Sequence, residues 1–194
     1  MNKLGLKDLA PYLPYGLSCH AMGESIEGKP ILFTLMGLSD DLLNHKHAEL
    51  WAGENEDGTT EDIITMALDD TFPLLRPMSD LTEEITHGDE TFVPMEKLAQ
   101  IAFERLDTFH IHSDIEIITA YKTDEKEAYR TLKYDADNKS FVVSVLDENL
   151  FRIRNLATKN QYDLFQKLCE WHIDFQGLIG RGVAINLHTI DNGK

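Results

Sequence analysis

Residues 161–181 read QYDLFQKLCEWHIDFQGLIGR, and this stretch carries the clearest fold signal of the chain. Its apolar side chains recur at steps of four, three, four and three residues: Leu164, Leu168, Trp171, Phe175 and Leu178. This spacing predicts an α-helix with one apolar face, begun by Asn160 as its N-cap and stopped by Gly182. A helix over 161–181 is about 30 Å long at 1.5 Å per residue. We expect its apolar face to pack on a sheet; binding of a partner helix is the alternative.

Strand patterns fill the first half of the chain. Four segments have strand character: 17–22, 30–37, 48–52 and 64–68. The first two are separated by a turn at 28–29, and the Asp-Gly pair at 57–58 is typical of a tight hairpin turn. We therefore expect an N-terminal antiparallel meander.

Prolines and helical spacing organise the middle of the chain. Pro73 and Pro77 exclude a regular helix between them, while Asp80 and Glu83 have the capping-box spacing of a short helix. Pro94 suits the first turn of a helix that continues to about residue 106. Three strand segments follow: 115–121, 128–134 and 141–146. The order predicts an α+β fold, with the antiparallel N-terminal meander, then a helix, antiparallel strands and a long C-terminal helix packed on sheet.

The length and composition are those of a globular protein. The chain has 194 residues, of which 42% are hydrophobic and 27% charged, enough for one domain or two small ones. We expect an acidic, β-rich half over 1–90 and an α+β half over 91–194, with one integrated domain as the alternative.

The sequence favours a soluble protein of the cytoplasm. Residues 1–17 lack the basic and continuous apolar regions of a secretory signal. No apolar run approaches the about 20 residues that a membrane-spanning helix needs. Cys19 and Cys169 lie 150 positions apart in different contexts, which favours two reduced thiols over a disulfide.

Negative charge is concentrated in one region. Residues 40–90 contain fifteen Asp and Glu but only two basic residues, Lys46 and Arg76, a net charge of −13 out of −16 for the whole chain. A surface of one sign repels phosphate, so direct binding of nucleic acid or of an anionic membrane through this region is disfavoured. An acidic surface by itself names no activity.

Three segments together resemble a known family. They read LAPYLPYGL at 9–17, PLLRPMSDLTEEI at 73–85, and EWHIDF at 170–175 with GLI at 177–179 and GVAI at 182–185. The set resembles a family of small uncharacterised proteins found in phages and prophage-like elements of Bacteroides-type gut bacteria. Members of that family often have an acid and a lysine after Leu-Ile, where this chain has Gly180 and Arg181. The resemblance implies a mobile-element context inside a bacterial host cell; the family has no assigned activity, so it implies no catalytic residue.

Arg76 and three aspartates are the candidate binding residues. Arg76 is the only basic residue between Lys46 and Lys97. Its guanidinium has either a structural role, in which it pairs with an aspartate or bonds carbonyls beside the prolines, or a functional one, in which it clamps a carboxylate or phosphate. The candidate partners are Asp80, Asp69 and Asp70. Asp69 and Asp70 are also a carboxylate pair suited to metal or acid–base chemistry, with a solvated loop as the alternative.

Patterns for metals, cofactors and nucleophiles are incomplete. The acidic segment 53–61 superficially resembles a calcium loop, but the first and twelfth ligand positions fall on Gly53 and Ile64. Two alternate-residue pairs, His45 with His47 and His110 with His112, have no third ligand nearby. Phosphate-binding loops, serine-nucleophile motifs and zinc-protease motifs are absent from the sequence. We predict no metal, no cofactor and no catalytic residue.

These observations favour a non-enzymatic accessory protein that acts through an unknown protein partner. Three alternatives stay open. The first is a metal-dependent hydrolase or nuclease that uses Asp69, Asp70 and the histidine pairs. The others are an acidic mimic of DNA that inhibits a basic host protein, and a component of the virion or its assembly.

Overall fold

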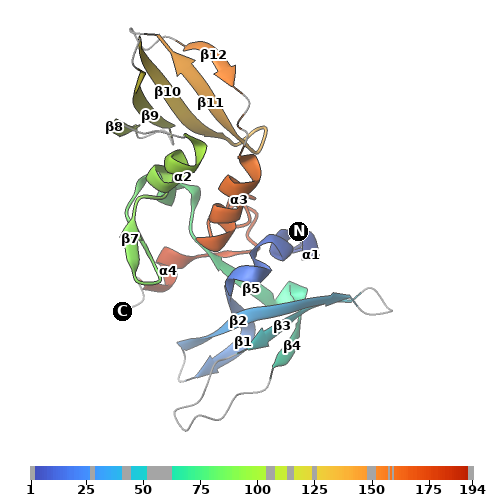
Figure 1. Cartoon of the computed structure of the whole chain (residues 1–194). Helices are drawn as coiled ribbons and strands as arrows, with labels where there is room; N and C mark the ends of the chain where they lie inside the picture. Colours follow the sequence, from blue (N-terminus) through green and yellow to red (C-terminus); the bar gives the residue numbers. More distant parts are fainter. Residues whose placement is uncertain are drawn as a thin grey trace. The chain divides into compact units, whose positions relative to one another are not determined.

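The computed structural model describes residues 3–26, 29–40, 45–51, 63–103, 108–112, 116–123, 126–147, 152–156, 158 and 160–191. The chain forms two compact units, one of Met1–Pro77 with Gln176–Lys194 and one of Met78–Phe175 (Figure 1). The first unit therefore contains both ends of the sequence. Whether 1–90 and 91–194 behave as separate domains stays a prediction; the chain passes between the two compact units after Pro77 and again after Phe175.

The first unit is built on a six-stranded sheet. Its strands are β1 (Ser18–Ile26), β2 (Lys29–Asp40), β3 (Lys46–Trp51), β4 (Ile64–Ala67), β5 (Thr71–Leu75) and β13 (Ile185–Asn186), in the order β13-β5-β1-β2-β3-β4. The run from β1 to β4 is the predicted antiparallel meander, which is confirmed. The pair of strands at one edge of the sheet is not part of the predicted meander. There β13 lies parallel to β5, so residues near the end of the chain join the sheet.

Short helices complete the first unit. They are α1 (Leu6–Leu9), the 3₁₀ helices η1 (Ala10–Tyr15) and η2 (Leu68–Asp70), and α4 (Leu187–Asp191). The predicted turn at 13–16 is the end of η1, and Gly16 closes it with a φ of 61°. Alternation along the strands sends Cys19 and Ala21 of β1 and Phe33 and Leu35 of β2 to one face, where each is at most 6% exposed. That face is the inner face of the sheet.

The second unit joins a five-stranded antiparallel sheet to two helices. The strands are β8 (Thr108–His112), β9 (Glu116–Thr123), β10 (Lys126–Asp135), β11 (Ser140–Leu146) and β12 (Arg152–Leu156), in the order β12-β11-β10-β9-β8. The helices are α2 (Pro94–Ala102) and α3 (Gln161–Glu170), preceded by η3 (Met78–Thr82) and the hairpin of β6 (Ile85–His87) and β7 (Glu90–Phe92). Residues from α2, α3, β10 and β11 share one core, so the α+β class with a C-terminal helix packed on sheet is confirmed.

Two of the predicted helices differ in detail from the structure. Asp80 lies within η3 and is only 4% exposed, so it does not stand at a helix N-cap. Pro94 does occupy the first turn of α2, as predicted, but that helix ends at Ala102.

The predicted extent of the C-terminal helix to Arg181 is wrong, because α3 ends at Glu170. His172 has a φ of 57°, and its N–H donates to the Cys169 carbonyl at 3.1 Å. The N–H of Ile173 donates to the Leu168 carbonyl at 2.8 Å. These two bonds form a Schellman closure, which reverses the chain and satisfies the last carbonyls of the helix.

Burial explains why the apolar spacing continued past the true end of the helix. Trp171, Ile173 and Leu178 are at most 4% exposed although none of them is in a helix. A second closure follows at Gly182, whose φ is 72°, where the Val183 N–H donates to the Leu178 carbonyl at 3.1 Å. Apolar spacing records burial, and here two successive turns bury the residues that a continuous helix would also bury.

The closure of α3 makes a prediction about residue 172. A side chain with a Cβ is strained at positive φ, whereas glycine is not. We expect His172→Gly to be more stable to urea than His172→Ala by about 1 kcal/mol, because both substitutions remove the imidazole and only glycine removes the strain. Equal stability of the two variants would show that the left-handed conformation is not retained in solution.

Candidate functional site

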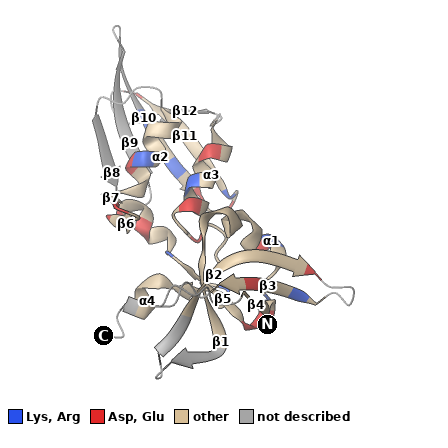
Figure 2. Cartoon of the chain, turned by 60° about the horizontal axis from the view of Figure 1, so that its bottom comes forward, with Lys and Arg blue, Asp and Glu red and all other residues tan. Residues whose placement is uncertain are grey.

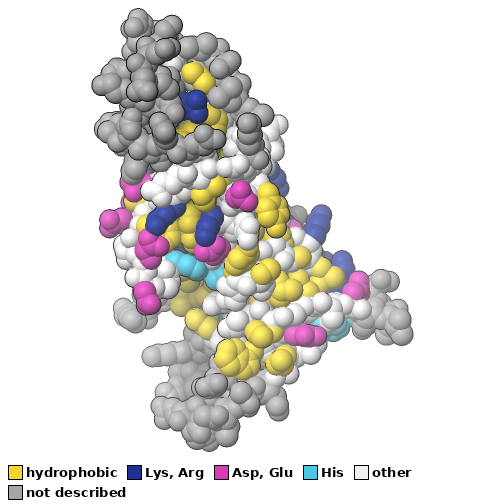
Figure 3. Space-filling view, in the orientation of Figure 1, with side chains coloured by type: hydrophobic (Ala, Val, Ile, Leu, Met, Phe, Trp, Pro, Cys, Tyr) yellow, Lys and Arg dark blue, Asp and Glu magenta, His cyan; other side chains and the backbone are white. Residues whose placement is uncertain are grey.

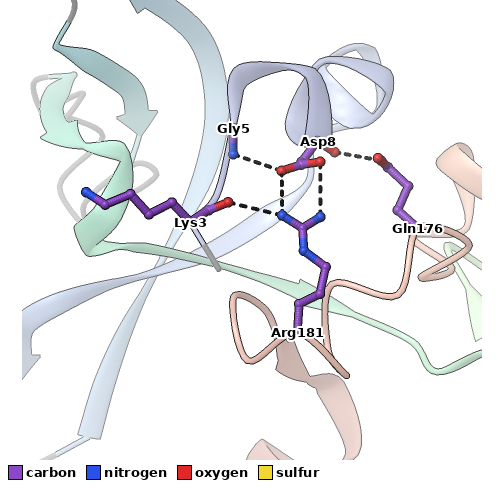
Figure 4. Close-up of polar contacts among 5 residues, drawn as sticks. All are labelled: Lys3, Gly5, Asp8, Gln176 and Arg181. Carbon is purple, nitrogen blue, oxygen red and sulfur yellow. Dashed lines mark hydrogen bonds and ion pairs between the residues drawn. The ribbon is translucent and has the colours of Figure 1, made fainter. Parts of the chain in front are cut away.

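An ion pair joins the beginning and the end of the first unit. The Arg181 guanidinium donates from Nη1 to Oδ1 of Asp8 at 3.2 Å and from Nη2 to Oδ2 at 3.1 Å (Figure 4). Nη2 also donates to the carbonyl of Lys3 at 3.0 Å, and the Gln176 side-chain amide donates to the Asp8 carbonyl at 2.8 Å. We call these four residues the terminal clasp.

The clasp holds a buried carboxylate. Asp8 is only 4% exposed, and its Oδ2 also accepts the Gly5 N–H at 2.8 Å at the start of α1. Burial by itself would raise the pKa of Asp8, but the hydrogen bonds from Arg181 and Gly5 outweigh burial and lower that pKa. The two-pronged geometry suits a guanidinium and a carboxylate, so both groups are fully engaged with each other.

The four predicted binding residues are divided between the two units. Asp69 and Asp70 lie in η2 and Arg76 directly follows β5, all in the first unit, whereas Asp80 belongs to the second. The Lys3 ammonium binds Oδ2 of Asp69 at 2.5 Å, and this exposed contact raises the pKa of Lys3. Arg76 is half-buried, and its pairing with one of the aspartates stays a prediction.

The candidate metal ligands gain no third partner among the described residues. His45 and His47 have ring centroids 6.4 Å apart in an edge-to-face arrangement. No group of three His, Cys, Asp or Glu that suits a metal ion occurs among the residues that the structure describes. The side chains of His110 and His112 and the acidic segment 53–61 lie outside the described residues.

Both cysteines are buried and free. Burial raises the pKa of the Cys19 thiol to about 12 and that of Cys169 to about 11. The thiolate is the nucleophilic form of cysteine, so neither thiol is poised for covalent chemistry near neutral pH.

The outer face of the six-stranded sheet carries exposed apolar side chains. Met22, Leu32 and Met36 are 56%, 43% and 52% exposed, and we call these three residues the outer apolar face. His20 of β1 lies opposite both Leu32 of β2 and Phe72 of β5, which forms a row across three strands. Figure 3 shows hydrophobic side chains at the surface over β1 to β3.

A carboxylate borders this face. The register of β2 shifts between Leu35 and Gly37, where Met36 forms a bulge. The Glu49 side chain of β3 lies directly over Gly37, in the space that a Cβ would need. The described Asp and Glu residues otherwise lie on many separate elements (Figure 2).

The outer apolar face and the terminal clasp were not predicted from the sequence, and only the first left a signal. The run ILFTLM at 31–36 is apolar at almost every position, which predicts a strand with apolar residues on both faces. Arg181 was noted only as the last residue of the predicted helix and as a departure from the resembling family. Its partner Asp8 is 173 positions away, so no local pattern connects the two.

Membrane spanning and known relatives add no further assignment. Within the described part of the chain, every helix is too short or too polar to cross a bilayer. Comparison of the chain with protein-family models, curated proteins and solved structures finds no match.

The clasp makes a prediction about stability. Arg181→Met leaves the Asp8 carboxylate buried without its cation, and we expect a loss of about 2–3 kcal/mol in the free energy of unfolding, measured with urea. This lies below the usual cost of breaking a buried pair because the Arg181 side chain is 30% exposed. Lys3→Gln, which removes an exposed ion pair and leaves the Lys3 carbonyl in place, is the control and should cost much less. A loss for Arg181→Met no larger than the control's would contradict the role of the clasp.

The lowered pKa of Asp8 makes a prediction about acid. The pKa of Asp8 is lower in the folded chain than in the unfolded chain, whose value is about 3.9. The ionised carboxylate therefore stabilises the fold at every pH above about 3.9. The contribution is lost as the pH falls through the folded-state value. The stability difference between wild type and Asp8→Asn should therefore narrow between about pH 5 and about pH 2, as measured by urea unfolding. A difference independent of pH would argue against an ionised Asp8 in the fold.

Proposed function

We propose that this protein is a non-enzymatic accessory protein of a phage or prophage-like element, and that it binds a protein partner through the outer apolar face. The proposal places it in the cytoplasm of the bacterial host. One observation carries it: Met22, Leu32 and Met36 are exposed on strands whose neighbouring residues Ala21, Phe33 and Leu35 are buried. The resemblance of three sequence segments to phage and prophage proteins supplies the biological context.

The chemistry of the face supports a protein partner. Single exposed apolar residues are ordinary, but three on two neighbouring strands offer apolar area that gains free energy when another surface covers it. Two of the three are methionines, whose unbranched side chains adapt to differently shaped partners. A sheet face of this kind offers contact area without any group arranged for catalysis.

The alternative functions have weaker support. A metal-dependent hydrolase needs three or four convergent ligands, and the described residues contain no such group. A mimic of DNA needs regularly spaced carboxylates, whereas the described ones of residues 40–90 lie on β2, β3, η2, η3, the β6–β7 hairpin and the segment between η3 and β6. A role in the virion or its assembly is compatible with the proposal, because it too requires a protein partner.

The test is capture of the partner with a matched pair of variants. The full-length tagged chain is expressed in host cells carrying the element, and recovered proteins are identified by mass spectrometry. We expect Leu32→Thr combined with Met36→Thr to reduce recovery of one specific protein by about tenfold or more, because two apolar contacts are lost. Threonine retains the preference for strand, and both sites are more than 40% exposed, so the fold should tolerate the change.

Tyr162→Ser is the control, because Tyr162 is 79% exposed but lies on α3 in the second unit. It should leave recovery unchanged. Equal recovery with the double variant would overturn the proposal. So would turnover of a substrate, in a panel of metals and substrates, that Asp69→Asn abolishes.

A further inference from the structure

A groove of the first unit adjoins the outer apolar face. Its volume is about 520 Å³, which is within the range of pockets that hold a ligand. The apolar part of its lining comes from five residues: Leu4, Met22, Leu68, Phe72 and Val183. Met22 belongs to both the groove and the outer apolar face, so the two surfaces are continuous.

The strand register extends the apolar surface from Leu32 to the groove. His20 of β1 lies opposite Leu32 of β2 on one side and opposite Phe72 of β5 on the other. Residues directly opposite each other in an antiparallel pair share a face, so Phe72 lies on the same face as Leu32. Phe72 is partly exposed and lines the groove. A partner that covers Leu32 therefore reaches the groove within the spacing of two strands, about 10 Å.

Three charged residues also line the groove, and each of them is paired within the protein. Arg181 donates two hydrogen bonds to the buried carboxylate of Asp8. The Lys3 ammonium binds Oδ2 of Asp69 at 2.5 Å, and both residues belong to the lining. A charged occupant would lose water without meeting an unmatched charge of opposite sign in the described lining, whereas an uncharged apolar occupant has no such cost. The lining therefore favours an uncharged occupant.

We propose that the groove receives one bulky, uncharged apolar side chain of the partner protein, which anchors the partner on the outer apolar face. This inference rests on the proposed protein-binding function and names the chemistry of the partner at this position. The side chain enters beside Met22 and Phe72. Leu4, Leu68 and Val183 are at most 8% exposed and form the wall that it contacts.

An anchor of this kind is the usual source of affinity in a protein interface. A few apolar or aromatic side chains that fill pockets carry most of the binding free energy, and the contacts around them exclude water. The groove beside the outer apolar face has this arrangement. A free small molecule in the groove would leave Leu32 and Met36 uncovered, whereas a partner protein uses both surfaces.

The test measures binding of three single-residue probes to the full-length chain, labelled with ¹³C at the methionine methyl groups. The probes are the N-acetyl methylamides of phenylalanine, lysine and glutamate, which differ only in the side chain. Met22 reports on the groove, and Met36, which is 52% exposed and does not line it, is the matched control. We expect the phenylalanine probe to shift the Met22 signal to saturation and the Met36 signal less. The two charged probes should bind about tenfold more weakly, because they offer less apolar surface.

Substitutions separate the groove from the rest of the sheet. Phe72→Thr should weaken binding of the phenylalanine probe about fivefold or more, because an apolar contact is lost. Leu32→Thr is the matched control, since Leu32 is an exposed apolar residue of the same sheet that does not line the groove; it should leave probe binding unchanged. Lys3→Gln and Asp69→Asn should each change the affinity by less than about twofold, because the probe is uncharged.

The Met36 signal also checks the fold of the first unit in each variant. If Phe72→Thr moves that signal in the absence of probe, Phe72→Leu takes its place, because leucine keeps an apolar side chain and removes only the ring. It should weaken binding of the phenylalanine probe in the same direction.

Three results would overturn the inference. A Met36 shift as large and as saturable as that of Met22 would show general contact with exposed methionines. Tighter binding of a charged probe, with changes of opposite direction after Lys3→Gln and Asp69→Asn, would identify a charged occupant. A Met22 shift that depends on protein concentration without any probe would identify a second copy of the chain.

Capture of the cellular partner separates this inference from the proposed function. Reduced recovery with Phe72→Thr, of the same protein that requires Leu32 and Met36, would support the anchor. Loss of that protein with Leu32→Thr and Met36→Thr, but not with Phe72→Thr, would overturn the inference and leave the proposed function standing. Binding of the phenylalanine probe without any protein that requires Leu32 and Met36 would overturn both and identify a free apolar molecule as the occupant.

Discussion

The pairing of Asp8 with Arg181 closes the first unit. That unit consists of two chain segments separated by the whole of the second unit, so its last residues must be held to its first ones. The buried carboxylate of Asp8 binds the guanidinium, Gln176 bonds the carbonyl of Asp8, and β13 adds to the edge of β5. A buried charge is costly without its partner, which makes this contact specific as well as stabilising. The position of residues 181–183 depends on this pairing, and these residues line a cavity together with Met22 and Phe72.

The sheet of the same unit has apolar residues on both faces, and the two faces have different consequences. One face is buried by the unit's own residues and supplies its core, while Met22, Leu32 and Met36 leave the other face ready for a partner. In the proposed function the exposed apolar residues supply the affinity for the partner.

In the second unit the sequence pattern predicted some helices and strands and missed others. Helix α2 begins at the predicted Pro94, and the strands β9, β10 and β11 lie where alternation of side chains placed them, within two residues. The strands β6, β7, β8 and β12 are short or flank other elements, and they were not expected. Helix α3 begins at the predicted Gln161 but ends eleven residues early, since residue spacing reports burial and not the hydrogen bonds that end a helix.

The sequence by itself determined the α+β class, the antiparallel meander, the start of the C-terminal helix and the acidic character of the first half. These features depend on periodicity, turn residues and composition, which are local. Only the tertiary structure decided that Asp8 meets Arg181, that Lys3 meets Asp69 and that Asp80 belongs to another unit than Asp69. Such contacts join residues 66 to 173 positions apart. They arise from the path of the folded backbone, and no spacing along the chain records them.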